Sequence, residues 1–259
     1  MFEIFLEEHD IQYFCVSEHW LSQDEAALYS FPNFDVANIY CRQISTHGGV
    51  AIYTRKGIMS NEVCLQHLCE EMSFEVTAIQ VVEENCIIIV IYRSPSSEIK
   101  IFFTKLYEAL NYVSKNYKCQ IILTGDFNIN LLENSVNTTK FKNIIVSFNL
   151  HTVINEPTKY NIKSNTGHDN ICTDLYSKHH GKVITDKFGD HLGIMLYFLS
   201  HKNKDIPSIR TKTCRNINNT NCEKLVNVLR QQNFAYVNDN NLSVEEVFNY
   251  FHQRFVDIF

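Results

Sequence analysis

The chain has 259 residues and a formal net charge of −6, and 45% of its residues are hydrophobic. With 18 Phe and 13 Tyr against only 8 Gly and 4 Pro, this composition indicates a globular protein and excludes a disordered one. The net charge excludes a general electrostatic attraction to nucleic acid, so any such contact needs a local patch or a metal ion.

The N-terminal stretch Phe2–Glu8 is acidic, where a targeting segment would be basic, and no apolar run reaches the about 18 residues that span a membrane. The nine cysteines are odd in number and lie mostly inside apolar runs, which favours reduced cysteines over a disulfide framework. We therefore expect an intracellular protein, nuclear or cytoplasmic, that is not secreted. Cys64, His67 and Cys69 suggest a zinc clip only weakly, because no second pair at zinc spacing accompanies them.

Apolar runs predict seven strands, which in chain order are 13–18, 50–54, 74–82, 86–92, 119–124, 171–176 and 192–198. Several of these runs are apolar on both faces, as a sheet covered on both sides requires. Apolar residues at helical spacing predict two helices, one over 97–117 and one near 138–149. Strands separated by a few helices predict an α/β sandwich.

The composition changes after about His201. Residues 201–221 are polar and locally basic, and two amphipathic helices are predicted to follow. The second begins with Ser243-Val-Glu-Glu246, a capping box, and then places Val247, Phe248, Phe251 and Phe255 at helical spacing. The simplest expectation for these Phe side chains is packing on the main domain. We predict a domain over residues 1–200 and a basic linker with helices over 201–259.

Five polar clusters follow or precede predicted strands. In chain order they are Ser-Glu18-His-Trp20, Tyr92-Arg-Ser-Pro95, Gly125-Asp126-Phe-Asn128, Gly167-His-Asp169-Asn and Gly189-Asp190-His191. Each one alone is more often a surface turn or a structural histidine. Together they supply a metal carboxylate, an Asp–Asn pair to hold a nucleophile, and a His with a second Asp to orient it. These are the parts that a metal-assisted phosphodiester hydrolase needs.

The order of these motifs resembles the endonuclease/exonuclease/phosphatase superfamily, most closely the apurinic-endonuclease-like domain of non-LTR retrotransposons of the jockey and LINE type. The resemblance rests on SEHWL (17–21), GGVAIYTR (48–55), IYRSP (91–95), LTGDFNINLL (123–132), HDNICTDL (168–175) and GDHLGI (189–194). It covers about residues 1–200 and implies a two-sheet, four-layer α/β sandwich of the DNase I-like type. Residues 201–259 resemble the connector that precedes reverse transcriptase in such elements.

The resemblance implies catalytic roles for five residues. Asp126 would orient or deprotonate the attacking water, and Asn128 would hold that water and a phosphate oxygen. His191 would donate a hydrogen bond to the charge that builds on the phosphate, with Asp169 orienting its ring. Tyr92 would stabilise the transition state near the leaving group.

The resemblance also implies a metal and its ligands. Glu18 would bind Mg²⁺, with Mn²⁺ as an alternative, and Asp190 would lie beside the metal or its waters. One carboxylate is chemically sufficient, because Mg²⁺ keeps several waters and binds substrate phosphate. Arg93 and Asn170 would contact the substrate.

Three departures from the family pattern stand in this sequence. Family members usually begin with a strand whose Asn helps to bind the metal and phosphate, whereas this sequence starts within the helix that follows, at Phe2–Glu8. We therefore expect the first strand to be missing and its neighbours to have unpaired backbone groups. Gly189 replaces a usual Ser, and His168 replaces an apolar residue, which we expect to disturb the strand at Asp169.

The resemblance thus implies a metal-dependent DNA endonuclease, derived from a retrotransposon, that nicks target DNA. The departures favour an alternative, a catalytically impaired remnant that binds nucleic acid or protein, for which the basic stretch 202–215 and the last helix are candidates. A phosphatase or phospholipid phosphodiesterase is the third hypothesis. We expect DNA as the partner, no membrane contact, no small-molecule cofactor and a monomer.

Overall fold

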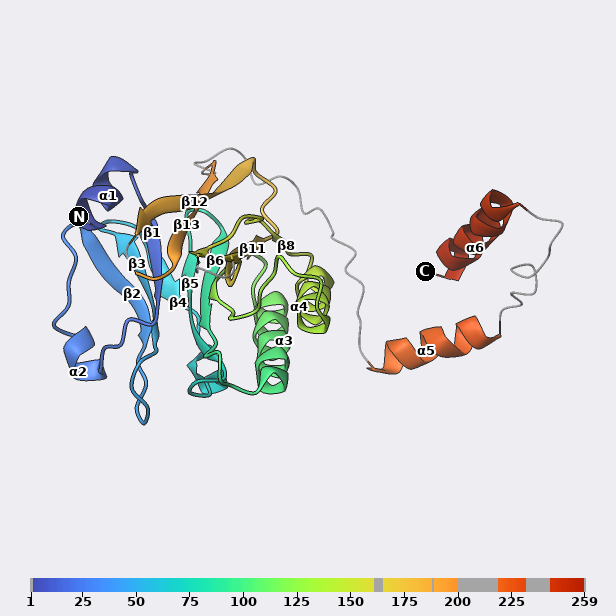
Figure 1. Cartoon of the computed structure of the whole chain (residues 1–259), viewed down its shortest axis with the longest axis horizontal. Helices are drawn as coiled ribbons and strands as arrows, with labels where there is room; N and C mark the ends of the chain where they lie inside the picture. The colour runs from blue at the N-terminus through green and yellow to red at the C-terminus, as the bar shows by residue number, and fades with distance from the viewer. Residues whose placement is uncertain (1, 161–164, 188, 200–218, 232–242, 259) are drawn as a thin grey trace. The chain divides into compact units, whose positions relative to one another are not determined.

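The computed structural model describes residues 2–160, 165–187, 189–199, 219–231 and 243–258. The chain divides into two compact units, Met1–Ile209 and Arg210–Phe259. All strands of the described residues belong to the first unit (Figure 1).

A six-stranded sheet forms the centre of the first unit. Its strand order is β4-β5-β6-β7-β11-β8, in which only β6 and β7 are parallel. The strands are β4 (Ser60–Glu62), β5 (Glu75–Val81), β6 (Cys86–Tyr92), β7 (Gln120–Asp126), β11 (Asp169–Thr173) and β8 (His151–Thr152). Tyr92 lies beside Asp126, and Asp126 lies beside Asp169. Three polar residues therefore lie side by side at the same end of three neighbouring strands.

Two helices cover the outer face of this sheet, α3 (Ile99–Asn116) and α4 (Val136–Ser147) (Figure 1). Helix α3 is the crossover that joins the parallel strands β6 and β7, as parallel pairing requires. Its buried face, which includes Phe102 and Leu106, packs with Phe141 of α4 in one apolar core. The short 3₁₀ turn η1 (Gln66–Leu68) packs against the same face.

The second sheet has the order β1-β3-β2, all antiparallel. Its strands are β1 (Tyr13–Ser17), β3 (Val50–Arg55) and β2 (Phe34–Tyr40). A separate hairpin of β12 (His179–Lys187) and β13 (Leu192–Phe198) packs on the same side of the central sheet. Apolar side chains such as Ile52, Ile88 and Ile122 fill the space between the layers.

The helix α1 (Phe2–Glu8) covers the outer face of the β1-β3-β2 sheet, where Leu6 packs with Phe14 and Tyr53. The order helix, sheet, sheet, helices gives four layers, which confirms the predicted α/β sandwich. Three small elements complete the first unit, α2 (Gln23–Ala26) and the hairpin of β9 (Lys159–Tyr160) and β10 (Asn165–Thr166).

The predicted disturbance at His168 is wrong. Strand β11 begins at Asp169 and pairs with β7 in continuous register as far as Thr173. The carbonyl of His168 accepts a hydrogen bond from the N–H of Phe127 at 3.1 Å, so this residue joins the two strands instead of separating them.

The second unit contains α5 (Asn219–Arg230) and α6 (Val244–Ile258). The predicted capping box is present: Ser243 N donates to the Glu246 carboxylate at 2.8 Å, and Glu246 N donates to Ser243 Oγ at 3.3 Å. The basic stretch 202–215 and the side chain of Phe255 lie outside the described residues. None of the described helices is long and apolar enough to cross a membrane.

Candidate functional site

The turn at the end of β7 depends on a glycine. Gly125 has φ +138°, and a Cβ atom at this position would lie 1.8 Å from the carbonyl oxygen of Ile91 on β6. Only a residue without a side chain allows the two parallel strands to approach here. The Gly125-Asp126 pair is therefore part of a buried strand end and not a surface turn.

Asn128 fixes the carboxylate of Asp126 in place. Its backbone N–H donates to Asp126 Oδ1 at 2.8 Å, and its side-chain amide donates to Asp126 Oδ2 at 3.1 Å. The same amide nitrogen donates to the carbonyl oxygen of Arg93 at 2.7 Å. Asn128 adopts φ +48°, a conformation that asparagine tolerates better than most residues. These contacts make Asn128 an orienting partner of Asp126.

His191 precedes β13 and lies within reach of two carboxylates. Its Nδ1 is 2.8 Å from Asp169 Oδ2 and 4.0 Å from Asp126 Oδ2. Thr158 also donates to Asp169 Oδ2, at 2.7 Å, which holds that carboxylate in position. One ligand atom each of Asp126, Asp169 and His191 lies within 4.8 Å of the others. The structure therefore brings these three predicted residues together.

Lys159 is a member of the site that the sequence analysis missed. Its ammonium is 2.8 Å from Nε2 of His191 and 2.8 Å from Oδ2 of Asp190. It reaches both because β9 forms a β-bridge with His191. A single lysine in a two-residue strand has no sequence signal of its own, so only the fold reveals this contact.

The charges of these groups act on one another. Burial, followed by the charge of Asp169, raises the pKa of Asp126 to about 7. Burial lowers the pKa of His191, but the hydrogen bond and charge of Asp169 act in the opposite direction and leave this pKa above its ordinary value. The hydrogen bond from Lys159 lowers the pKa of Asp190. The site thus holds a carboxylate with a pKa of about 7 beside a histidine whose pKa is raised.

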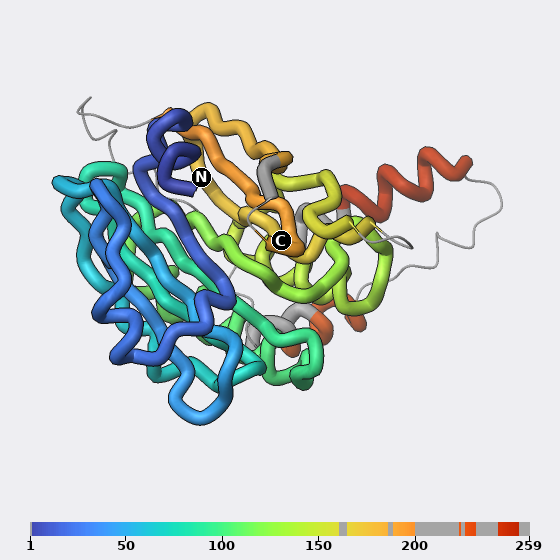
Figure 2. The backbone as a smooth tube through the Cα atoms, turned by 60° about the vertical axis from the view of Figure 1, so that its left-hand side comes forward, coloured from blue at the N-terminus to red at the C-terminus, as the bar shows by residue number. Residues whose placement is uncertain are grey.

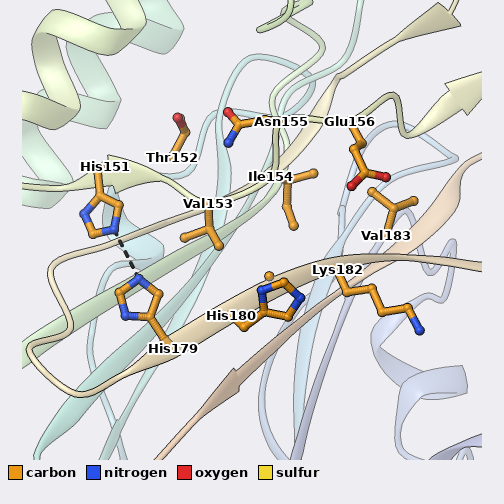
Figure 3. A pocket seen from close by; sticks show the side chains of 11 residues that line it. His151, Thr152, Val153, Ile154, Asn155, Glu156, His179, His180, Lys182 and Val183 are labelled. Atoms are coloured by element: carbon orange, nitrogen blue, oxygen red, sulfur yellow. Dashed lines mark hydrogen bonds between the residues drawn. The ribbon is translucent and has the colours of Figure 1, made fainter.

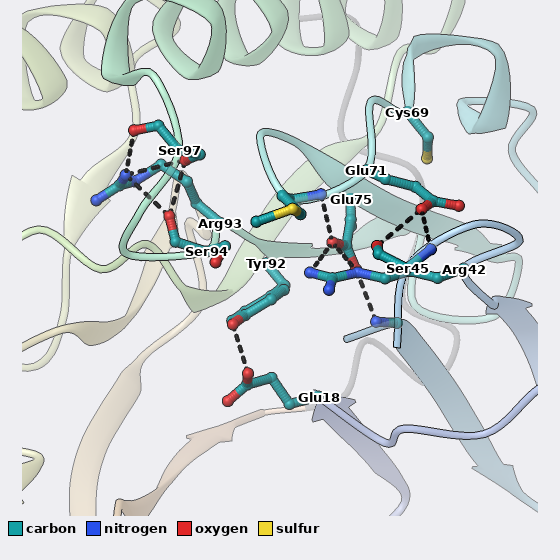
Figure 4. A network of polar contacts seen from close by, with 12 residues as sticks. Glu18, Arg42, Ser45, Cys69, Glu71, Glu75, Tyr92, Arg93, Ser94 and Ser97 are labelled. Atoms are coloured by element: carbon teal, nitrogen blue, oxygen red, sulfur yellow. Dashed lines mark hydrogen bonds and ion pairs between the residues drawn. The ribbon is translucent and has the colours of Figure 1, made fainter. Parts of the chain in front are cut away.

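Glu18 projects from the end of β1 toward Tyr92 on β6 (Figure 4). The Tyr92 hydroxyl donates to Glu18 Oε1 at 2.5 Å. Glu18 has φ +58°, and its N–H donates to the carbonyl of Gly49 at 2.8 Å. Burial, together with the Glu18 hydrogen bond, raises the pKa of Tyr92, so this phenol keeps its proton and orients the carboxylate.

A buried ion pair supports the loop that holds Glu18 (Figure 4). The Glu75 side chain is 0% exposed and accepts hydrogen bonds from Arg42 Nε at 2.7 Å and from the N–H of Gly49 at 2.6 Å. Gly49 in turn binds the backbone of Glu18. This support cannot be predicted from the sequence, because Glu75 stands within an apolar strand.

Arg93 and Asn170, the predicted substrate ligands, both lie against backbone groups. Arg93 is buried and donates to backbone carbonyls, including those of Phe127 at 2.9 Å and Asn128 at 2.6 Å. Asn170 is buried and binds the backbone of Ile154 through both ends of its amide. Their hydrogen-bonding groups are engaged by the protein, so both residues shape the loops around the site.

Five of the predicted site residues line one cavity of about 1040 Å³, whereas Tyr92, Arg93, Asn128 and Asn170 do not. Glu18, Asp126, Asp169, Asp190 and His191 all belong to its lining. A cluster of oxygen donors is the type of site that Mg²⁺ prefers, and a cation would offset the burial and the Asp169 charge that raise the pKa of Asp126. Asp126, Asp169 and His191 offer ligand atoms within 4.8 Å of one another, so they fit a divalent metal, and Glu18 and Asp190, the predicted ligands, line the same cavity.

A second cavity, of about 410 Å³, contains a pair of histidines (Figure 3). His151 Nε2 is 3.2 Å from His179 Nε2, and His179 Nδ1 is 3.0 Å from the carbonyl of Ser177. The carbonyl can only accept, so His179 donates from Nδ1. This pair forms an ordinary hydrogen bond between β8 and β12, and none of the predicted site residues lines its cavity.

No protein-family model and no curated protein matches the chain. Solved structures do match it. The endonuclease domain of TRAS1, a telomere-specific non-LTR retrotransposon, is 14% identical, with a TM-score of 0.60 over 78% of this chain and 91% of that chain. A 3′ phosphatase from Neisseria, bound to a product DNA hairpin, is 16% identical, with a TM-score of 0.59 over 76% and 92%.

An endonuclease/exonuclease/phosphatase family protein from Leptotrichia buccalis is 17% identical, with a TM-score of 0.55 over 76% of this chain and 91% of that chain. All three similarities extend over most of both chains, at sequence identities that report on the fold alone. The four layers described above are thus those of a known architecture. The chain has the fold of the endonuclease/exonuclease/phosphatase proteins, which the sequence motifs predict.

Proposed function

We propose that the protein is a metal-dependent phosphodiesterase that nicks DNA, of the kind encoded by non-LTR retrotransposons. The observation that carries this proposal is the convergence of Asp126, Asp169 and His191, with Glu18, on one cavity. The similarity to the TRAS1 endonuclease and to a Neisseria enzyme bound to DNA supports DNA as the substrate.

In the proposed reaction, Asp126 accepts a proton from the attacking water. Its pKa of about 7 suits a base that works near neutral pH. The water oxygen forms a bond to phosphorus, and the bond from phosphorus to the 3′ oxygen breaks. The departing oxygen takes a proton from solvent, which leaves a 3′-hydroxyl and a 5′-phosphate. Asn128 keeps the carboxylate of Asp126 directed at the water through its two hydrogen bonds.

His191 donates a hydrogen bond from Nε2 to the phosphate once the anion replaces it as the partner of Lys159. Asp169 holds the Nδ1 side of the imidazole at 2.8 Å, which leaves Nε2 as the nitrogen that faces Lys159 and the incoming phosphate. Fixed donors of this kind typically contribute about 2.7–4 kcal/mol to lowering a barrier. A divalent metal held by Glu18 and Asp190, when bound, would neutralise phosphate charge and lower the pKa of a coordinated water.

Nicking of supercoiled plasmid in Mg²⁺ tests this proposal. We expect wild-type protein to nick, and EDTA, Asp126→Asn and His191→Ala each to reduce the rate by at least about 100-fold. Glu62→Gln, an exposed carboxylate on β4, is the matched control and should leave the rate unchanged. Equal nicking by wild type and Asp126→Asn would identify a contaminant and refute the proposal.

A phosphomonoester substrate separates this function from the phosphatase hypothesis. A mannosyl-6-phosphatase from Bacteroides thetaiotaomicron has the same fold, at 14% identity and a TM-score of 0.56. We expect the protein to release phosphate from a sugar phosphate no faster than it cleaves DNA. Preference for the sugar phosphate would overturn the assignment of DNA. DNA binding without any metal-dependent cleavage would favour the alternative of a catalytically impaired binding module.

A further inference from the structure

Two histidines face each other between the central sheet and the β12–β13 hairpin. His151 lies on β8, at the edge of the six-stranded sheet, and His179 is the first residue of β12. Their Nε2 atoms are 3.2 Å apart, whereas the ring centres are 5.3 Å apart, so the two nitrogens point toward each other and the rings do not stack (Figure 3). Two imidazole nitrogens thus converge on one point.

The ring of His179 is held by its other nitrogen. Nδ1 donates to the carbonyl oxygen of Ser177 at 3.0 Å, and in the neutral imidazole this leaves a lone pair on Nε2. Histidines that bind metals almost always donate their second ring nitrogen in this way, to a carbonyl, a carboxylate or water, which fixes the tautomer and the direction of the ring. His179 is therefore oriented as a metal ligand is.

The separation of the two nitrogens matches that of two ligands on one metal ion. Zn²⁺ binds imidazole nitrogen at about 2.0–2.1 Å in tetrahedral geometry, which places two such nitrogens about 3.3–3.4 Å apart. The observed 3.2 Å needs only a small movement of the rings. A metal ion between the rings takes the place of the hydrogen atom there, and neutral His151 then carries its proton on Nδ1.

The surroundings leave room for water and select the class of metal. His151 is exposed and His179 is half-buried, and both line the cavity of about 410 Å³. Among the described residues, no third His, Cys, Asp or Glu forms a ligand group with these two, so water completes the coordination. The side chain of Lys182 points away from the two rings (Figure 3). Imidazole suits Zn²⁺, Cu²⁺ and Ni²⁺, whereas Mg²⁺ prefers oxygen.

A metal ion at this place acts on the element that carries His191. The strands β12 and β13, gold and orange in Figure 2, form a two-stranded sheet of their own. His191 directly precedes β13, and the N–H of Leu192 donates to the carbonyl oxygen of Thr158 at 2.7 Å. A metal bridge from His151 to His179 adds a second link between the hairpin and the segments around the central sheet.

We propose that His151 and His179 form a binding site for a divalent transition-metal ion such as Zn²⁺, completed by water, which ties the β12–β13 hairpin to β8. The site shares no residue with the candidate active site and takes a different class of metal. Metal binding here is independent of the proposed nuclease function. Loss of nicking in Mg²⁺ would refute that function and leave this site standing.

Calorimetric titration with Zn²⁺ alone tests the site. All proteins carry His191→Ala, which removes the nitrogen ligand of the other candidate metal group. Adding His151→Ala or His179→Ala should weaken Zn²⁺ binding at least about tenfold, since even the loss of a group that orients a ligand costs that much. His180→Ala, the next residue of β12 and part of the same cavity, is the matched control and should leave binding unchanged. Equal Zn²⁺ binding with and without these substitutions would overturn the inference.

Nitrogen NMR of the histidine rings tests the site in wild-type protein, without any substitution. Zn²⁺ should shift the Nε2 signals of His151 and His179 and leave those of His180 in place. Mg²⁺ at the same concentration should shift none of the three. Unchanged signals of His151 and His179 in excess Zn²⁺ would overturn the inference.

Hydrogen exchange tests the link to the hairpin. In the His191→Ala protein, Zn²⁺ should slow the exchange of the Leu192 amide at least about threefold, because the bridge opposes local opening of the hairpin. Adding His179→Ala should abolish this protection. Zn²⁺ binding without slower exchange, or protection that survives His179→Ala, would refute the link between the hairpin and β8.

Discussion

At the scale of single residues, Gly125 makes the strictest demand on the sequence. It combines φ +138° with a backbone oxygen 1.8 Å from any added Cβ atom. Gly125→Ala should therefore lower the free energy of unfolding by about 3 kcal/mol or more, measured by urea denaturation. Gly57→Ala is the matched control, because Gly57 has φ +90° but open space around it, and it should cost only about 1 kcal/mol. Equal losses would show that no close approach exists at Gly125.

The pKa of Asp126 predicts an unusual pH dependence. Its pKa is raised by folding to about 7, so the metal-free protein favours the protonated carboxyl. This contribution to stability is complete below the ordinary carboxyl pKa and is lost as the pH rises through about 7. When the pH is raised from 6 to 8, the melting temperature of the metal-free wild type should fall relative to that of Asp126→Asn. Mg²⁺ should stabilise wild type more at pH 8 than at pH 6, and equal metal effects at both pH values would contradict this account.

At the scale of secondary-structure elements, the buried ion pair on β5 joins the central sheet to the loop before β3. Glu75→Gln removes the charge that compensates Arg42 and weakens the bond to Gly49. We expect a loss of about 3 kcal/mol or more in unfolding free energy. Glu62→Gln on the neighbouring strand β4 should change it by no more than about 0.5 kcal/mol. A similar change in both variants would mean that the pair does not support the fold.

The same scale explains which elements the sequence could predict. Strands β6 and β7 are buried on both faces and read as continuous apolar runs, so their positions follow from composition. Strands β2 and β12 were not predicted, because their sequences show no regular alternation of apolar and polar residues. The residues that interrupt it are Asp35, Asn38, His180 and Lys182. They fold as strands because β3 and β13 pair with them, which is a tertiary effect.

In the candidate site, too, some residues can be predicted from local sequence and others only from tertiary structure. Asp126, Asp169 and His191 stand in short motifs beside strands, and they meet because β7 and β11 are neighbours. Lys159 and Glu75 carry no motif, and only pairing between distant segments brings them to the site. Arg93 and Asn170 are buried and bind backbone groups, which sequence alone does not reveal, and a contact of either with substrate stays a prediction.

At the scale of the whole molecule, net charge decides how DNA can bind. The chain carries −6, and among the described residues no Lys or Arg lines the large cavity. Affinity for a DNA duplex should therefore depend on a divalent cation, and removal of Mg²⁺ by EDTA should weaken it at least tenfold. Its salt dependence should be shallow, since few counterions are released. Tight binding in EDTA with a steep salt dependence would point to a basic surface in place of the cavity.

The central claim is that separate residues form one working site, and a double-mutant cycle on plasmid nicking in Mg²⁺ tests it most directly. Asp169 is 2.8 Å from His191 and acts on the phosphate through that ring, while its charge also raises the pKa of Asp126. Asp169→Asn and His191→Ala should each slow nicking, and the loss in the double variant should be far smaller than the product of the two single losses. Losses that multiply in the double variant would show that the two residues act independently and would contradict this account.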